Sequence, residues 1–434
     1  MTGSSSLSPE QPPRRIALRR FSALSGARRR VVGFSRALMG RVVGSRRKKE
    51  TSALTLALVV IVALVAWSLV GSGTSPSPPL SSPPLSSTPG PDPVQTTIAA
   101  PAFPTPGGAI ASVGAYDAVT CATLTQCLAV GATSAGVGSA AFSGDGGASW
   151  APLTVPIGTP ELDAVTCADA SNCVAVGADD AVVTTDGGTT WALNTVADSS
   201  TTLLGVACAT ASDCVADGVV PGAGTSDGGR LFVSGDGGAS WTAAAMPSGM
   251  PGLGGLACPT ATLCIAVGDA VLVSGDGGQT WQQRTVVGGM DSLRTVSCAS
   301  PLDCIAVGPN AEGASDANAT ANAIVTSDGG TTWRNEAMPV GTSPVQRISC
   351  GSAQQCLAVG PGLTSSQAPV FLASTDGGST WSAAPAPAGM VGVADASCVS
   401  GFHCVAVGRT TSGPAAATTE DGVTWTTTAA AVPA

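Results

Sequence analysis

From residue 109 to the C-terminus, the apolar positions come in short runs that are separated by Gly, Asp, Ser and Thr. Such runs, rich in Val, Ala and Leu, are typical of short β-strands and not of amphipathic helices. One stretch shows the order of the elements, because residues 162–167, 173–177, 181–185 and 191–196 predict four strands with turns between them. The pattern therefore indicates an all-β domain.

Two signatures recur with this pattern and set its period. The first is a Cys pair six positions apart, followed by a short apolar run that ends in Gly: Cys121 and Cys127, Cys167 and Cys173, Cys208 and Cys214, Cys258 and Cys264, Cys298 and Cys304, Cys350 and Cys356, Cys398 and Cys404. The second is Ser/Thr-x-Asp-Gly-Gly-x-Ser/Thr-Trp, with Asp145 and Trp150, Asp186 and Trp191, Asp236 and Trp241, Asp276 and Trp281, Asp328 and Trp333, Asp376 and Trp381. A seventh, degenerate copy spans 418–425 and ends at Trp425, with Glu420 and Asp421 displaced against the other copies.

The signatures divide the 326 residues of 109–434 into seven units of about 47 residues. A four-stranded unit of this size is typical of one propeller blade. Because such a unit cannot bury both faces of its sheet alone, the seven units are expected to close into a ring in which each blade packs on its neighbours. The sequence thus predicts a seven-bladed β-propeller with four-stranded blades over 109–434.

The second signature resembles the Asp-box, or bacterial neuraminidase, repeat, and the resemblance covers 109–434. Asp-box propellers include sialidases, some glucan hydrolases and the non-catalytic photosystem II stability and assembly factors. The resemblance implies the fold, and its closest branch is the assembly-factor one. It implies little about activity, because enzymes and binding proteins share the motif.

Each Asp box has a structural interpretation. The Asp carboxylate can accept backbone N–H groups, the Gly pair supplies positive φ, and the Trp packs against the blade. The alternative is that the six Asp residues bind calcium. This alternative is disfavoured because the sequence lacks the Asp-x-Asp-x-Asp-Gly spacing of calcium loops.

All 14 Cys residues belong to the seven pairs. In each unit the two Cys flank the turn between the first and second strands, so that their side chains can meet across a hairpin. We therefore expect seven local disulfides and an oxidising compartment. A zinc or redox site is disfavoured, because the sequence has no CxxC spacing and one His, His403. We expect neither a metal nor a cofactor.

The first 108 residues differ from the repeats and predict three segments. Residues 1–50 hold 13 Lys or Arg against two Glu and predict a disordered, basic cytoplasmic tail. Residues 51–71 include the uncharged run 53–70, which is long enough to cross a bilayer as one helix. Residues 72–108 are rich in Pro, Ser and Thr and predict an extended linker.

The basic residues before the apolar run predict a single-pass membrane protein with a cytoplasmic N-terminus and an extracytoplasmic propeller. The alternative is a cleaved signal peptide. The apolar run is longer than a usual signal-peptide core, however, and no Ala-x-Ala site follows it closely. We therefore expect a signal-anchor in the cell membrane.

The charge of the propeller segment excludes one class of partner. From residue 109 on, the chain has 6 Arg, no Lys, 21 Asp and 4 Glu, for a net charge of −19. Proteins that bind nucleic acid need clustered Lys and Arg to displace counterions from phosphate. We expect no nucleic-acid partner, and a monomeric propeller.

Spacing separates the constant parts of the repeat from the variable ones. Each Trp is followed by the next first Cys after 17 residues, whereas the distance from the second Cys to the Trp varies between 17 and 29. Insertions therefore lie between the second and third strands, on the face opposite the Cys and Asp-box turns. They are either tolerated insertions or binding loops. The candidate partner-binding residues are Asn310, Glu312, Asp316 and Asn318 in the longest loop, with Arg230.

Sialidase chemistry needs a Tyr nucleophile and an Arg cluster, and the sequence supplies neither convincingly. The one Tyr, Tyr116, lies five positions before the first Cys, where the other six units have Leu or Val. Core packing explains it better. Four units have polar residues one position later, and we expect these to line the central funnel and to bind a small polar ligand, or else to be solvated: Asp117, Asp163, Arg294 and Gln346.

The sequence thus predicts a membrane-anchored, extracytoplasmic propeller that binds an envelope protein or glycan without catalysis. We identify no catalytic residue. The alternative is a cell-surface glycoside hydrolase that acts through the funnel, because two carboxylates facing one another suit glycoside hydrolysis.

Overall fold

The computed structural model describes residues 113–197, 200–220, 228–250, 252–286, 293–308, 321–339, 342, 345–362 and 367–429. The chain divides into two units, Met1–Thr96 and Thr97–Ala434, and only the second contains described residues. The expected tail, membrane helix and linker lie outside these residues, as do Asn310, Glu312, Asp316 and Asn318. Within the described ranges, no helix is long and apolar enough to span a bilayer.

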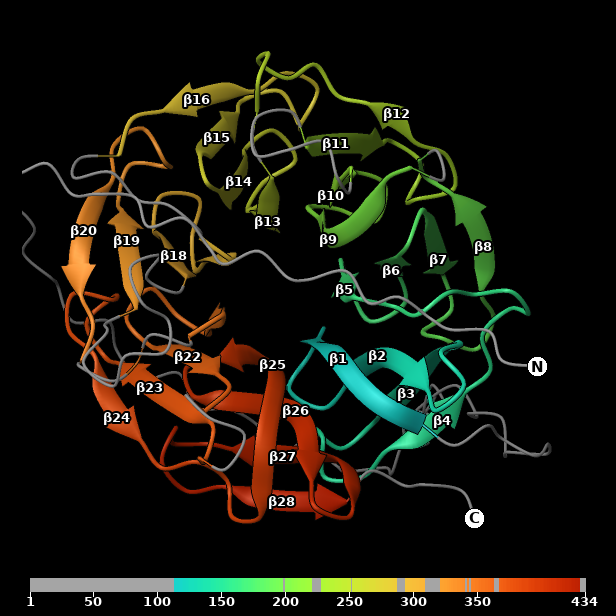
Figure 1. The fold of residues 1–434 in the computed structure, drawn as a ribbon, viewed down its shortest axis with the longest axis vertical. Helices are drawn as coiled ribbons and strands as arrows, with labels where there is room; N and C mark the ends of the chain where they lie inside the picture. Colours follow the sequence, from blue (N-terminus) through green and yellow to red (C-terminus); the bar gives the residue numbers. More distant parts are fainter. Residues whose placement is uncertain are drawn as a thin grey trace, which may run out of the picture. The chain divides into compact units, whose positions relative to one another are not determined.

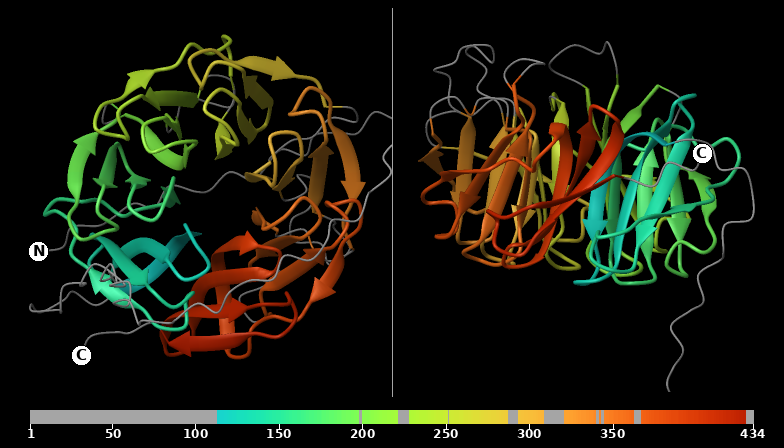
Figure 2. Two further views of the ribbon diagram at one scale, coloured as in Figure 1. Left: turned by 180° about the vertical axis from the view of Figure 1, so that it is seen from behind. Right: turned by 90° about the horizontal axis from the view of Figure 1, so that it is seen from below.

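Seven four-stranded antiparallel sheets stand around a common axis, each built from four consecutive strands (Figures 1 and 2). The innermost strands are β1 (Val113–Cys121), β5 (Ala164–Cys167), β9 (Thr202–Cys208), β13 (Leu253–Ala257), β17 (Thr295–Cys298), β21 (Arg347–Cys350) and β25 (Met390–Ser400). The second strands are β2 (Cys127–Thr133), β6 (Cys173–Gly177), β10 (Cys214–Val219), β14 (Cys264–Gly268), β18 (Cys304–Gly308), β22 (Cys356–Gly360) and β26 (His403–Thr410).

The third strands are β3 (Gly138–Ser143), β7 (Asp180–Thr184), β11 (Gly229–Ser234), β15 (Val271–Ser274), β19 (Asn322–Thr326), β23 (Val370–Ser374) and β27 (Gly413–Thr419). The outer strands are β4 (Ala151–Leu153), β8 (Ala192–Thr195), β12 (Thr242–Ala243), β16 (Gln282–Arg284), β20 (Arg334–Ala337), β24 (Ser382–Ala384) and β28 (Thr426–Ala429). The expected seven-bladed propeller is confirmed.

The hydrophobic core lies between the blades. Seven clusters of buried side chains occur in the described residues, and each draws on two neighbouring blades. Val405 and Val407 of blade 7 pack with Val119 and Ala129 of blade 1, which closes the ring without a strand exchanged between blades. Because burying one such side chain stabilises a fold by about 1.5–3 kcal/mol, the seams hold the ring together.

The seven expected disulfides are present, one in each blade. Each joins the end of the innermost strand to the start of the second strand, as in the pair Cys121 and Cys127, which lie directly opposite each other in the β1–β2 register. No described cysteine is free. The disulfides therefore cross-link the two strands beside the turn at one face of every blade.

Six Asp boxes share one hydrogen-bond network, shown by the first. The Ser143 hydroxyl donates to Asp145 Oδ1 at 2.8 Å and accepts the Gly147 N–H at 2.7 Å. The Trp150 indole N–H donates to the Gly147 carbonyl at 3.0 Å. Gly147 has φ of +91°, and a Cβ there would lie 2.9 Å from the Val405 side chain of the preceding blade. The position therefore requires Gly for both its backbone conformation and the close approach of the blades.

The box and the disulfide turn of a blade are joined directly. Gly146 N–H donates to the Thr125 carbonyl at 2.8 Å, and the equivalent bond recurs in blades 2 to 6. The two turns therefore lie at the same face of the disc, as the strand order predicts.

The seventh box corrects the expected register. It begins at Thr419, not at residue 418, and it lacks one Gly. The Thr419 hydroxyl donates to Asp421 Oδ1 at 3.1 Å and accepts the Gly422 N–H at 2.9 Å. The Trp425 indole nitrogen is buried without a hydrogen-bond partner. In the other blades the carbonyl of the second Gly is its partner, so the deletion removes that acceptor.

Candidate functional site

In blades 1, 3, 4 and 7 the innermost strand holds one extra residue, four positions before its first Cys, and in blades 2, 5 and 6 the equivalent residue immediately precedes the strand. In blade 1 this residue is Asp117, where the β1–β2 register shifts between Tyr116 and Ala118. In blade 2 it is Asp163, whose N–H donates to the Val176 carbonyl at 2.8 Å beside the Ala164–Val176 pair. Such a bulge sets two residues against one and redirects their side chains. The repeat thus places equivalent residues at the inner edges of the blades, and in blades 1 and 2 these residues are acidic.

Two of these equivalent residues belong to an acidic group at the axis. Burial, followed by the charges of Glu161 and Asp117, raises the pKa of Asp163 to about 6. Burial and the charge of Glu161 also raise the pKa of Asp117. One oxygen of Asp117, Oδ2, is buried without a hydrogen-bond partner. The two carboxylates predicted to line the funnel therefore share one electrostatic environment.

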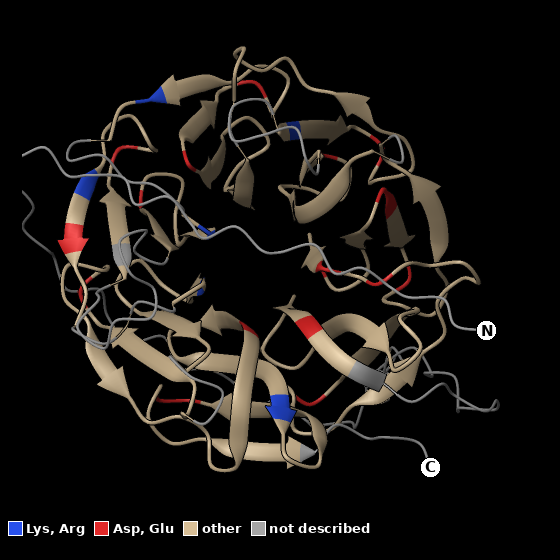
Figure 3. Ribbon diagram, viewed as in Figure 1, with Lys and Arg blue, Asp and Glu red and all other residues tan. Residues whose placement is uncertain are grey.

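Arg347 supplies the positive charge of this group. Its charge opposes the raised pKa of Asp117 and Asp163, and also that of Asp217 and Asp395. Arg347 Nε lies 3.9 Å from Asp395 Oδ1, and Asp395 Oδ2 accepts the Val119 N–H of blade 1 at 3.0 Å. The axial cluster, defined as Asp117, Glu161, Asp163, Asp217, Arg347 and Asp395, therefore links blades on opposite sides of the axis. Acidic positions on β1 and β25 are visible near the axis in Figure 3.

Asp217 is the most unusual member of the axial cluster. It is 0% exposed, and neither of its carboxylate oxygens has a hydrogen-bond partner. Burial raises its pKa to about 7, against the opposing charge of Arg347. It faces Gly205 across the β9–β10 pair, and a Cβ at Gly205 would lie 2.2 Å from Asp217 Oδ1. The missing side chain at Gly205 thus makes room for the carboxylate.

The remaining predicted residues have separate places. Arg294 and Gln346 occupy the equivalent positions of blades 5 and 6, where their N–H groups donate to Val307 and Val359. Neither residue shifts the pKa of Asp117 or Asp163, and the cation that lowers these pKa values is Arg347. The sequence held a signal for one member that was not predicted, Asp217, because the other six blades have Val at its position.

Tyr116 and Arg230 do not belong to the axial cluster. Tyr116 is 2% exposed, its ring centroid lies 6.1 Å from that of Trp150, and burial raises its pKa to about 12. It is therefore a core residue, as its repeat position predicts. Arg230 is exposed on β11, donates to the Gly229 carbonyl at 2.9 Å, and borders a cleft of about 340 Å³ with Met246 and Met250.

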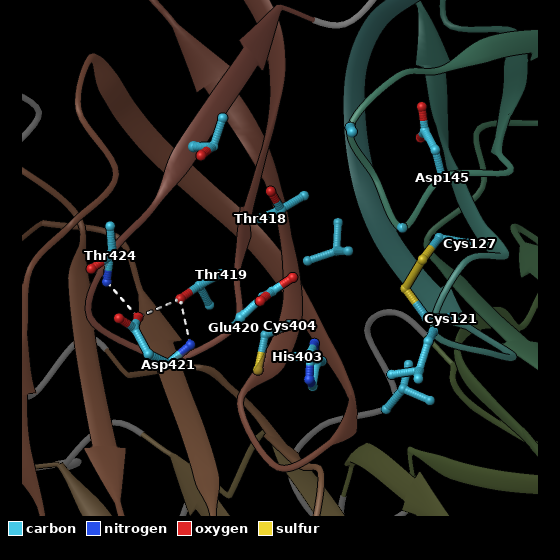
Figure 4. Close-up of a pocket in the computed structure, with 16 residues that line it drawn as sticks. Cys121, Cys127, Asp145, His403, Cys404, Thr418, Thr419, Glu420, Asp421 and Thr424 are labelled. Carbon is cyan, nitrogen blue, oxygen red and sulfur yellow. Dashed lines mark hydrogen bonds between the residues drawn. A yellow bond between two sulfur atoms is a disulfide. The ribbon is translucent and has the colours of Figure 1, made fainter.

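A larger cleft of about 700 Å³ lies at the seam of blades 7 and 1, on the face of the disulfide and Asp-box turns (Figure 4). Glu420 and His403 lie on its blade 7 wall, and Asp145 and the Cys121–Cys127 disulfide on its blade 1 wall. The sequence singled out none of these as a pocket.

No protein-family model matches the chain, and no curated protein matches it in sequence. Its fold is similar to that of YCF48 bound to a D1 peptide, with TM-score 0.50, 14% identity, and 71% of this chain and 93% of that chain covered. YCF48 from Cyanidioschyzon merolae matches with TM-score 0.50, 13% identity, and coverage of 70% and 95%. An ancestral GH74 enzyme matches with TM-score 0.53, 13% identity, and coverage of 73% and 46%. The fold is that of the YCF48 and GH74 propellers.

Proposed function

We propose that this protein is a non-catalytic binding scaffold for an envelope protein or glycan, and that the ligand contacts the axial cluster. The observation that carries the proposal is that carboxylates of blades 1, 2 and 7 share one electrostatic environment with Arg347 of blade 6, whose Nε lies 3.9 Å from Asp395 Oδ1. Acids held with raised pKa values beside a single cation have unused capacity to accept hydrogen bonds from a ligand. The YCF48 propeller, which has the same fold, occurs in a complex with a peptide.

We further propose that the propeller is held outside the cytoplasm by the apolar segment 53–70. Seven disulfides support this location, because such bonds persist in oxidising compartments. A protease-protection experiment on intact cells tests it. Cleavage of the propeller by external protease is expected, and full protection would contradict the proposal.

One observation favours a second function, glycoside hydrolysis. Asp163, with its pKa raised to about 6, is suited to donate a proton at neutral pH, and Asp117 is close enough to influence it. Pairs of acids with separated pKa values are typical of glycosidases. GH74 enzymes also share the fold.

One set of variants distinguishes the two functions. The oxidised chain is used to capture proteins from membranes of its native host and is also incubated with a glycan panel. Asp117→Asn with Asp163→Asn is the test variant, and Asp303→Asn, on the disulfide turn of blade 5, is the control. Capture lost only in the test variant supports the scaffold, whereas glycan cleavage lost only there supports the hydrolase. Capture that survives the test variant would exclude the axial cluster as the contact, and deletion of 310–320, which leaves β18 and β19 intact, then tests the loop.

A further inference from the structure

The cleft at the seam of blades 7 and 1 has a smaller counterpart elsewhere in the ring. At the seam of blades 5 and 6 the equivalent positions enclose about 160 Å³, against about 700 Å³ at the seam of blades 7 and 1. The two clefts correspond residue by residue: Cys350 to Cys121, Asp376 to Asp145, and Asp303 to His403. The smaller cleft therefore serves as an internal reference for the larger one.

Three local differences distinguish blade 7 at the larger cleft. The Asp box has one Gly fewer, so its turn is shorter by a residue. The disulfide turn is bonded to that of blade 6, since the Gly401 N–H donates to the Gly351 carbonyl at 3.0 Å. Thr426 stands where the smaller cleft has the longer side chain of Arg334.

The walls of the larger cleft are acidic. Three carboxylates line it, from Asp145, Glu420 and Asp421, and no Lys or Arg is among its lining residues. Hydrogen bonds from the backbone of Thr424 and Val423 lower the pKa of Asp421 to about 2, so this carboxylate is ionised. Glu420 makes no hydrogen bond to another lining residue in Figure 4 and stands where the other boxes have Gly, Ser or Thr.

Apolar contacts are also available at this cleft. Leu124 lines it and is 56% exposed, and Val399, Val405 and the Cys121–Cys127 disulfide complete the apolar part of the walls. In the smaller cleft, by contrast, Arg334 is among the lining residues, and it is paired with Glu336 at 2.8 Å. The larger cleft therefore combines unneutralised carboxylates with exposed apolar surface.

We infer that the cleft at the seam of blades 7 and 1 binds an extended peptide segment that carries Lys or Arg. A cleft of this volume lies within the range of ligand-binding sites. Complementary charge would direct such a segment to Glu420, and the alkyl part of a Lys or Arg side chain can lie along Leu124 while its charged end reaches a carboxylate. This site is separate from the axial cluster and does not depend on the function proposed for it.

The test uses the full-length oxidised chain in a non-ionic detergent and a fluorescein-labelled octapeptide of alternating Ala and Arg as the probe. Fluorescence anisotropy gives the dissociation constant at low and high salt. Glu420→Gln is expected to weaken binding roughly fivefold, as expected for one partly desolvated charge pair, with a smaller effect at high salt. The control is Asp303→Asn, which removes one negative charge at the smaller cleft and is expected to leave the affinity unchanged.

A second variant tests the geometry of the cleft. Inserting a Gly between Gly422 and Val423 restores the length of the other six boxes and supplies the carbonyl that the Trp425 indole lacks. We expect the insertion to raise the melting temperature while it weakens peptide binding at least fivefold. A loss of binding with a raised melting temperature cannot be attributed to unfolding.

Three results would overturn the inference. One is wild-type affinity in both the Glu420→Gln and the insertion variants. Another is an equal loss in Asp303→Asn, which indicates general attraction of a cationic peptide to an acidic protein. The third is a loss of affinity only in Asp117→Asn with Asp163→Asn, which would place the peptide at the axial cluster and support the proposed function instead.

Discussion

Replacement of Asp217 by Val should stabilise the propeller, and by an amount that depends on pH. The carboxylate is fully buried and has no hydrogen-bond partner. The other six blades have Val at this place, and blade 4 shows that Val267 fits opposite a Gly, Gly255. The variant therefore exchanges an unsatisfied acid for a side chain that the same fold already accommodates.

The size of the effect follows from the pKa of Asp217, which burial raises from its ordinary value of 3.8 to about 7. Between these pH values the folded chain keeps a proton that the unfolded chain has lost, so the free energy of unfolding falls as the pH rises. The free energy of unfolding is therefore lower above pH 7 than below pH 4 by about 4 kcal/mol, at 1.36 kcal/mol for each pKa unit. Asp217→Val removes this pH-dependent fall in the free energy of unfolding, because Val does not ionise.

The assay is urea denaturation of the oxidised chain at pH 4, 6 and 8. The gain of Asp217→Val over the wild type should be smallest at pH 4 and larger by roughly 4 kcal/mol at pH 8. Asp217→Asn is the matched control, because it also cannot ionise but still buries an amide, and it should show the same pH trend with a smaller gain. A gain that is constant between pH 4 and 8, or a Val variant less stable than the wild type at pH 8, would refute the reasoning.

Three further variants test other parts of the fold. Arg347→Met should raise the pKa of Asp117, Asp163 and Asp395, because the charge of Arg347 lowers all three pKa values. A carboxyl NMR titration measures these shifts, and Arg294→Met is the control that should not cause them. Equal shifts in both variants would contradict the role given to Arg347. Replacing one disulfide, Cys258 with Cys264, by two Ala should cost about 2 kcal/mol by the loop-entropy model, and an unchanged denaturation midpoint would argue against it. Asp276→Ala should cost about 1–2 kcal/mol and lower the melting temperature, because Asp276 accepts hydrogen bonds from Thr280 and Ser274; Asp276→Asn should cost less, and equal costs would argue against this network.

The repeats determined most of the fold because their interactions are local. A disulfide joins residues six positions apart, as in Cys121–Cys127, and the Asp-box bonds join Ser143 to Asp145 and Gly147 within four positions. Residue spacing alone is enough to identify such networks. For the same reason, the sequence predicted the blades, their strand order, the face that carries both turns, and the core position of Tyr116.

Only the tertiary structure decided what meets at the axis and at the seams. Asp395 accepts the N–H of Val119, 276 positions away, and Arg347 acts on Asp217 from three blades further along the ring. These contacts depend on closure of the ring, which the spacing of one repeat does not encode. The cleft likewise depends on how blades 7 and 1 pack, because residues of both blades line it. Local repeats thus fixed the blades, whereas packing between them decided which side chains share a site.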